Sequence, residues 1–141
     1  MSFKILYSSL IVIILFSCKK DNQDDRIPNV TVSQTIYLNL PSYTVLNSVG
    51  NYVYISGGYR GIIVYRRSIS EFVAYDRACP YDPTVSGALL EVDSNGLTTV
   101  DRHCGSKFLL VDGSVNQGPA TSPMKGYATQ YDGNNQVYIY N

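Results

Sequence analysis

The sequence is poor in the residues that most often carry catalysis or hold metal ions. Its 141 residues include one histidine, three cysteines, two methionines and no tryptophan. A single histidine excludes a metal site built on a histidine pair, and no Cys-x-x-Cys pair is present either. The chain also lacks a Gly-x-Ser-x-Gly elbow and a glycine-rich phosphate loop. We therefore predict no catalytic residues and a non-enzymatic protein.

An excess of charge of either sign is also absent. The chain has 11 basic and 11 acidic side chains, and no basic patch or arginine-rich helix stands out. Proteins that bind nucleic acid present a concentrated basic surface to the phosphate backbone. The even charge balance therefore argues against nucleic acid as a partner.

The longest hydrophobic run lies close to the amino terminus and is short. Lys4 precedes an apolar run from Leu10 to Phe16. A membrane-spanning helix needs about 20 apolar residues, whereas the core of a signal peptide has about 7–15. The following Ser17 and Cys18 complete a sequence that resembles a bacterial lipobox, in which the cysteine is acylated. We expect residues 1–17 to be a lipoprotein signal peptide and Cys18 to be the lipidated first residue of the mature chain.

The residues after Cys18 indicate a tether and the cellular location of the protein. Positions 19–26 are charged or polar without exception, so they cannot bury enough apolar surface to fold. We expect 18–30 to be a flexible tether and 31–141 to be one folded domain. The acidic content of the tether resembles the surface-export signal of lipoproteins from the Bacteroidetes, although a plain solvated linker fits equally well. We predict a bacterial membrane-anchored lipoprotein of the outer membrane, and leave open its periplasmic or cell-surface face.

The domain is predicted to be all-β. The chain has 13 tyrosines and many β-branched residues, and no window shows a sustained helical period. Glycine follows Asn or Asp at Gly96, Gly113 and Gly133, where a tight hairpin needs a positive φ angle. The short, regular spacing indicates a barrel or sandwich. The predicted strands span 35–40, 52–56, 61–67, 71–76, 88–92, 97–100, 107–111, 127–131 and 136–140.

Two of these strands carry tyrosines on one face. In 136–140 the alternation places Val137 and Ile139 on one side and Tyr138 and Tyr140 on the other. The segment 52–55 repeats the arrangement. Such a face can form a platform for a sugar or aromatic ligand, but we favour packing between sheets or at a barrel rim, because tyrosine suits half-buried strand positions.

Two loops carry a recognisable motif. The first contains Cys79-Pro80-Tyr81, and the second runs Asp101-Arg102-His103-Cys104-Gly105-Ser106-Lys107-Phe108. They resemble the two cluster-binding loops of Rieske iron–sulfur domains, which have Cys-x-His and then Cys-x-x-His running into Gly-Ser-x-Phe. The two strands before the first loop, the hairpin at 108–115 and the proline-containing loop at 118–123 extend the resemblance. It implies a Rieske-like antiparallel β-sandwich or barrel with two cluster-type loops.

The ligands of a Rieske cluster are largely missing. Two thiolates hold one iron of such a [2Fe–2S] cluster and two imidazoles hold the other. Here the imidazole positions hold Tyr81 and Cys104, and the second thiolate position holds Asp101, a hard oxygen donor. Of the four positions only Cys79 keeps its expected type. The resemblance therefore implies a degenerate family member, for which we predict no cofactor and no metal.

Two cysteines remain once Cys18 is assigned to lipid. An even pair in an exported protein indicates a disulfide, and the resemblance places Cys79 and Cys104 at the tips of loops that the fold brings together. Such a bond closes a loop of about 25 residues and stabilises the fold by roughly 3 kcal/mol. We predict an accessory or binding module with an unidentified protein or small-molecule partner, its loops stapled by this disulfide.

Four alternatives stay open. The protein can be an electron-transfer protein with an atypically ligated [2Fe–2S] cluster, or its disulfide can be redox-active. Cys79, Cys104 and His103 can form a mixed zinc site with Asp82 or Asp101. A nucleophile pair of Cys79 and His103 is conceivable too, but no orienting group or oxyanion hole accompanies it.

Overall fold

The structure of the protein, a computed structural model, describes residues 27–141. This part of the chain forms ten strands and one short 3-10 helix, which confirms the prediction of an all-β domain. The predicted signal peptide, Cys18 and residues 18–26 of the predicted tether lie outside the described residues. Within residues 27–141 no helix has the length and apolar character needed to cross a membrane.

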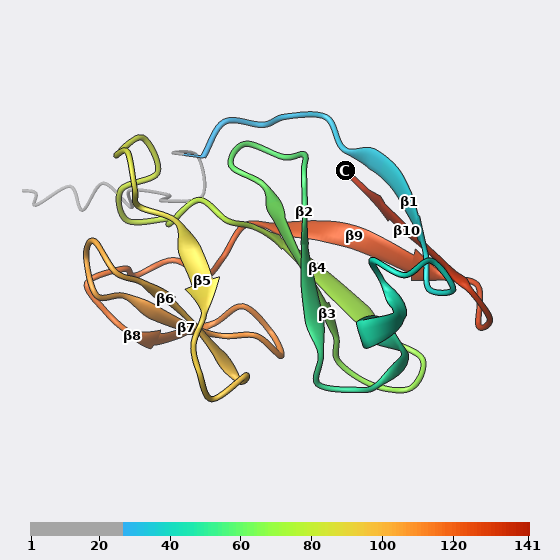
Figure 1. Ribbon diagram of the computed structural model, residues 1–141. Coiled ribbons are helices and arrows are strands. Elements are labelled where there is room, and N and C mark those ends of the chain that lie inside the picture. The colour runs from blue at the N-terminus through green and yellow to red at the C-terminus, as the bar shows by residue number, and fades with distance from the viewer. Residues whose placement is uncertain (1–26) are drawn as a thin grey trace, which may run out of the picture.

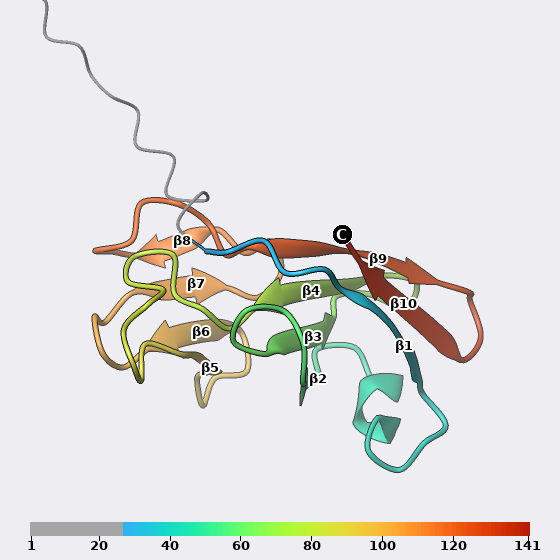
Figure 2. The same cartoon turned by 90° about the horizontal axis from the view of Figure 1, so that it is seen from above.

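The strands form two antiparallel sheets (Figure 1). A six-stranded sheet has the order β1-β10-β9-β4-β3-β2, and a four-stranded sheet has the order β5-β6-β7-β8. Figure 2, turned by 90°, also places the smaller sheet at one end of the larger one. The strands are β1 (Ser33–Tyr37), β2 (Tyr52–Ile55), β3 (Ile62–Arg66), β4 (Phe72–Asp76), β5 (Leu90–Val92), β6 (Thr98–Asp101), β7 (Lys107–Leu109), β8 (Val115–Gln117), β9 (Gly126–Tyr131) and β10 (Gln136–Tyr140).

All nine predicted strands are present, and two elements were not predicted. Strand β8 is paired with β7 and is only three residues long, so it gives little alternation to detect. The 3-10 helix η2 (Thr44–Asn47) spans four residues and buries Leu46 completely. The predicted hairpin glycines are confirmed, since Gly96, Gly113 and Gly133 have φ angles of 68°, 74° and 82°.

Strand β3 lies between the two hydrophobic cores, and all five of its residues are buried. Because side chains alternate along a strand, Ile62 and Val64 lie on one face of β3, in the hydrophobic core formed by residues of the larger sheet and η2. Ile63 and Tyr65 join the core that also contains Cys79. The hydrophobic interior therefore continues through β3 to the cysteine loops.

The tyrosines of β10 lie on its outer face. Val137 and Ile139 are fully buried, whereas Tyr138 and Tyr140 are each 36% exposed. The two tyrosine rings stack on one another, with centroids 4.9 Å apart and an interplanar angle of 16°. The predicted alternation is thus correct. Of the two placements that we favoured, packing between the sheets does not apply to these tyrosines, because they face outward.

The first of the described residues, 27–30, were predicted to belong to the tether, but they contact the domain. Ile27 is 3% exposed, and the Lys125 ammonium donates to the carbonyl of Pro28 over 2.9 Å. The amide of Asn141 donates to the carbonyl of Val30, also over 2.9 Å. Residues 27–30 therefore follow the surface of the domain.

The carboxylate of Asp76, at the end of β4, is fully buried and accepts four hydrogen bonds. The backbone N–H groups of Tyr59, Arg60 and Ala78 donate over 2.6, 3.2 and 2.8 Å. The hydroxyl of Tyr127 donates over 2.6 Å. Burial raises the pKa of Tyr127, and the hydrogen bond and negative charge of Asp76 raise it further. The carboxylate thus connects β4 to β9, to the turn before β3 and to the first cysteine loop.

Replacing Tyr127 with Phe tests the Asp76 network. The substitution removes one hydrogen bond to a buried charge, so we expect the free energy of unfolding to fall by about 2 kcal/mol. Tyr140→Phe is the matched control, because the ring of Tyr140 is partly exposed and surface substitutions change stability by at most about 0.5 kcal/mol. Urea denaturation measures both. Equal losses for the two variants would contradict the assigned role of Tyr127.

Replacing Gly58 with Ala tests how tightly the turn packs against that network. Gly58 has a φ angle of 62°, and an added Cβ would lie 2.5 Å from both Asp76 Oδ2 and the Tyr127 hydroxyl. Gly133→Ala is the matched control, because Gly133 has a φ angle of 82° and no atom within 4 Å of its Cβ position. Both variants carry the backbone strain of about 1–2 kcal/mol.

We expect Gly58→Ala to lose a further 1–3 kcal/mol or so through overpacking. The same denaturation measurement compares the two alanine variants. If Gly58→Ala lowers the free energy of unfolding no more than Gly133→Ala does, the turn can shift to accommodate the added Cβ and does not hold Asp76 in place.

Candidate functional site

The first cysteine loop connects β4 to β5 and is held at two points. Asp76 fixes its start through the N–H of Ala78. The Arg60 guanidinium fixes its middle by donating to the carbonyls of Pro83 and Val85 over 3.0 and 2.7 Å. Between these points Cys79 is fully buried. The shape of the loop therefore depends on a side chain about 20 residues earlier in the sequence.

The second cysteine loop connects β6 to β7 in a tight turn. The N–H of Gly105 donates to the carbonyl of Asp101 over 2.8 Å, and the N–H of Asp101 donates to the carbonyl of Ser106 over 2.9 Å. Gly105 has a φ angle of 82°, which a residue with a side chain adopts only with strain. The turn points Asp101 inward, where its carboxylate accepts the N–H of His103 over 2.8 Å.

The two loops bring four potential ligand atoms together. The sulfur atoms of Cys79 and Cys104 lie 3.7 Å apart, and the Cys104 sulfur lies 3.3 Å from Asp101 Oδ2. With Asp82 from the first loop, these residues offer one ligand atom each, all within 4.8 Å of one another. We call Cys79, Asp82, Asp101 and Cys104 the four-ligand group.

Burial and like charges perturb the pKa values of this group. Burial raises the pKa of the Cys79 thiol, and the adjacent Asp101 raises it further. Burial also raises the pKa of Asp82, and the negative charge of Asp101 adds to that shift. Burial alone would raise the pKa of Asp101, but hydrogen bonds from Cys79, the N–H of His103 and Cys104 lower it overall. Asp101 is therefore the carboxylate that stays ionised most readily.

The sequence motif located most of this group. Cys79, Asp101 and Cys104, from three of the four predicted ligand positions, lie together. Tyr81, at the fourth position, is 42% exposed, and its neighbour Asp82 points inward instead. From the sequence we considered Asp82 only as a ligand of an alternative zinc site, because nothing in the sequence shows which of two adjacent side chains turns inward.

His103 lies at the outer edge of the group. Its side chain is 52% exposed, and Nε2 lies 3.7 Å from Asp82 Oδ2. It is therefore paired with a carboxylate and not with a thiol. This arrangement gives no support to a nucleophile pair of Cys79 and His103, and it makes Asp82 and Asp101 the inward-facing partners of the cysteines.

Both thiols are free in the structure. A disulfide requires about 2.0 Å between the sulfurs, and the observed 3.7 Å is a non-bonded contact. The structure thus confirms that the two loops meet at their cysteines, and the disulfide itself stays a prediction.

The proline-containing segment between β8 and β9 packs against the second loop. The N–H of Ala120 donates to the Ser106 hydroxyl over 3.0 Å, and Ser106 in turn contacts the Cys104 sulfur over 3.1 Å. Ala120 and Met124 are buried in the same hydrophobic core as Cys79. This segment therefore holds the second loop from outside.

The donor set of two sulfurs and two carboxylates differs from that of a Rieske cluster. The group contains no imidazole, because His103 lies outside it. Carboxylate oxygens suit hard cations better than iron–sulfur clusters, while thiolates suit zinc. The residues present therefore do not reproduce the two-thiolate, two-imidazole ligand set of a Rieske cluster.

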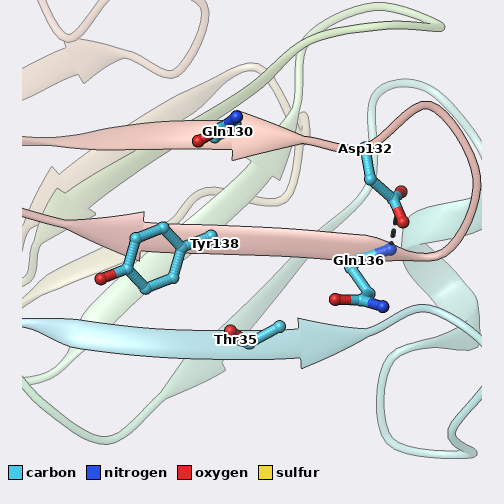
Figure 3. A pocket seen from close by; sticks show the side chains of 5 residues that line it. All are labelled: Thr35, Gln130, Asp132, Gln136 and Tyr138. Carbon is cyan, nitrogen blue, oxygen red and sulfur yellow. Dashed lines mark hydrogen bonds between the residues drawn. The ribbon is translucent and has the colours of Figure 1, made fainter.

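A separate hollow lies on the outer face of the larger sheet (Figure 3). It has a volume of about 300 Å³ and is lined by Thr35, Gln130, Asp132, Gln136 and Tyr138. All five residues are exposed or half-buried, and Asp132 already accepts the N–H groups of Asn134, Asn135 and Gln136. We regard the hollow as part of the solvent-facing surface of the sheet.

Solved structures share the fold, and two of them have a TM-score of 0.50. One is the cyanobacterial plasma membrane Rieske protein PetC3 from Synechocystis PCC 6803, with a TM-score of 0.50 and 23% identity, over 64% of this chain and 85% of that chain. The other comes from the complex of reduced oxygenase and oxidized ferredoxin in carbazole 1,9a-dioxygenase, with a TM-score of 0.50 and 15% identity, over 80% and 94% of the two chains. No protein-family model matches the chain, and a search of the curated proteins gave no match. The predicted Rieske-like fold is confirmed, and at these identities the likeness concerns the fold alone.

Proposed function

We propose that the protein is a lipid-anchored, non-enzymatic accessory or binding module of Rieske-like fold. In this proposal a bond between Cys79 and Cys104 joins the two loops in place of a cluster. The supporting observation is the 3.7 Å contact between the two sulfurs. A disulfide requires the two sulfurs to approach from that distance to roughly 2.0 Å.

The positions of the cysteines argue against a normal cluster. In the Rieske arrangement the first-loop cysteine binds one iron, and the position now held by Cys104 supplies a ligand to the other iron. Ligands of different irons are separated by the cluster between them. Here the two sulfurs are in contact, and carboxylates from both loops lie beside them.

The chemistry of the two thiols supports a non-enzymatic role. A reactive cysteine needs a lowered pKa and an accessible sulfur. Cys79 is fully buried and its pKa is raised, and the one histidine pairs with Asp82 instead. The same features suit a cysteine that is oxidised once and then stays in a structural bond.

Oxidation of the pair proceeds by exchange with an external disulfide. Cys104 is the more exposed of the two cysteines, so its thiolate attacks the external disulfide and expels one thiol. Cys79 then attacks the mixed disulfide and expels the second thiol. The two cysteines lose two electrons and two protons in total, and the external disulfide gains them. Oxidising compartments outside the cytosol support this exchange.

The cluster content of the purified protein tests the proposal. We expect protein made and purified without oxygen to contain far less than one equivalent of iron and of acid-labile sulfide, and to show no visible absorbance from a cluster. Metal analysis and sulfide determination measure this. Stoichiometric iron and sulfide would instead establish the electron-transfer alternative with an atypically ligated cluster.

The state of the two thiols is the second test. We expect a thiol-alkylating reagent to label neither Cys79 nor Cys104 in unreduced, unfolded protein, and to label both after reduction. Mass spectrometry of the peptides gives the count, with Cys104→Ser as the control in which Cys79 becomes labelled without reduction. Labelling of both thiols in the unreduced parent would disprove the staple. A reduction potential above about −300 mV would favour a redox-active disulfide over a structural one.

A further inference from the structure

We infer that the dithiol form of the protein binds one zinc ion through Cys79, Asp82, Asp101 and Cys104. This inference deepens the proposed binding-module function by naming a ligand, and it concerns the protein before its cysteines are joined. It requires the two loops to meet as the structure shows, and it does not depend on the lipid anchor. The site differs from a Rieske centre in holding a single ion through two sulfurs and two oxygens.

Two of the distances within the group are close to those of a tetrahedral zinc site, and the group as a whole lies within 4.8 Å, so it needs to contract around the ion. With Zn–S bonds of about 2.3 Å, a tetrahedral zinc ion holds two sulfurs about 3.8 Å apart. The Cys79 and Cys104 sulfurs lie 3.7 Å apart. With Zn–O bonds of about 2.1 Å, a sulfur and an oxygen on the same ion lie about 3.6 Å apart. The Cys104 sulfur and Asp101 Oδ2 lie 3.3 Å apart, so only a slight widening is needed.

The donor atoms favour zinc over Mg²⁺ and Ca²⁺. Mg²⁺ and Ca²⁺ require six or more oxygen ligands, and the four-ligand group supplies two carboxylates. Zn²⁺ accepts thiolate and carboxylate ligands together, and in structural sites it is almost always four-coordinate and tetrahedral. Binding releases two thiol protons to water and transfers no electrons. A disulfide between Cys79 and Cys104 removes both thiolates, so the bond and the zinc ion exclude each other.

An unpaired buried oxygen independently points to a missing positive charge. Asp82 Oδ1 is buried and has no hydrogen-bond partner, although burying an unpaired polar atom costs about 1–3 kcal/mol. The Asp82 side chain is only 13% exposed, and the carboxylate of Asp101 lies within the same 4.8 Å group. Two ionised carboxylates from different loops would repel one another there, and a proton shared between Asp82 and Asp101 is the alternative to a cation. A cation between them supplies a partner for Asp82 and removes the repulsion.

Backbone groups around the site orient its ligands. The N–H of His103 donates to Asp101 Oδ1 over 2.8 Å, which leaves Oδ2 facing the Cys104 sulfur. The N–H of Ser106 donates to the Cys104 sulfur over 3.5 Å. Ser106 is itself held by Ala120 from the adjoining segment. Such outer partners fix first-shell ligands in metal sites and account for much of their affinity.

Zinc titration of the full-length chain in detergent tests the inference. The protein is reduced under argon, freed of reductant and titrated with Zn²⁺ in competition with a chromophoric chelator. We expect one equivalent to bind. Co²⁺ titrated in the same way is expected to give the near-ultraviolet sulfur-to-metal charge-transfer absorbance of a thiolate ligand.

Substitutions separate ligands from bystanders. Cys104→Ser and Asp82→Asn are each expected to weaken binding by more than the roughly 10–100-fold that loss of an outer partner produces. Glu71→Gln is the matched control, since it removes a carboxylate that pairs with Arg67 at the surface, and it is expected to leave affinity unchanged. Protein oxidised with glutathione disulfide is expected to bind no zinc.

The thermal stability of Asp82→Asn gives a readout that a purely structural role of Asp82 would not produce. Without zinc this variant is expected to melt above the reduced parent, because the repelling charge is gone, and zinc is expected to raise its melting temperature less. Failure of the reduced parent to bind zinc, or binding by Asp82→Asn and Cys104→Ser as tight as the parent's, would overturn the zinc site. Neither result bears on the staple, which thiol labelling tests separately.

Discussion

The buried carboxylate of Asp76 is the interaction on which the rest of the structure depends. A buried charge without partners is strongly destabilising, and this one accepts hydrogen bonds from Tyr59, Arg60, Ala78 and Tyr127. These donors come from three segments that are distant in the sequence. Satisfying one carboxylate therefore fixes the turn before β3, the start of the first cysteine loop and the position of β9 at the same time.

Packing of the sheets connects the Asp76 network to the two cysteine loops. Strand β3 is buried on both faces. One face packs in the core of the larger sheet, and the other packs in the core that contains Cys79. The turn before β3 also presents Arg60 to the first loop. The second loop is tied to β6 and β7 by its own backbone hydrogen bonds. One loop joins the larger sheet to the smaller and the other lies within the smaller sheet, and both are held so that their sulfurs meet.

The sequence predicts those parts of the structure that depend on local pattern. Alternation located nine strands, and the Gly105-Ser106 motif aligned the second loop so that Asp101 and Cys104 were found. The first loop offers only Cys79 as a reference point. The path of this loop is held by long-range bonds, such as those from Arg60 to the carbonyls of Pro83 and Val85, which no local pattern encodes. The outward face of Tyr138 was missed for a similar reason, since alternation separates two faces without saying which one a second sheet covers.

The carboxylates of Asp82 and Asp101 bear on whether the cysteine pair forms only a structural disulfide or also binds zinc as free thiols. A disulfide alone would need only Cys79 and Cys104, and hydrophobic neighbours would serve it better than buried charges. Instead Asp101 is fully buried beside the sulfurs, and Asp82 carries an oxygen without a partner. Asp101 also accepts the N–H of His103 and so shapes the second loop in either form. The unpaired oxygen of Asp82 has no such use in a disulfide form, and it is the feature that a zinc ion bound to the dithiol form would account for.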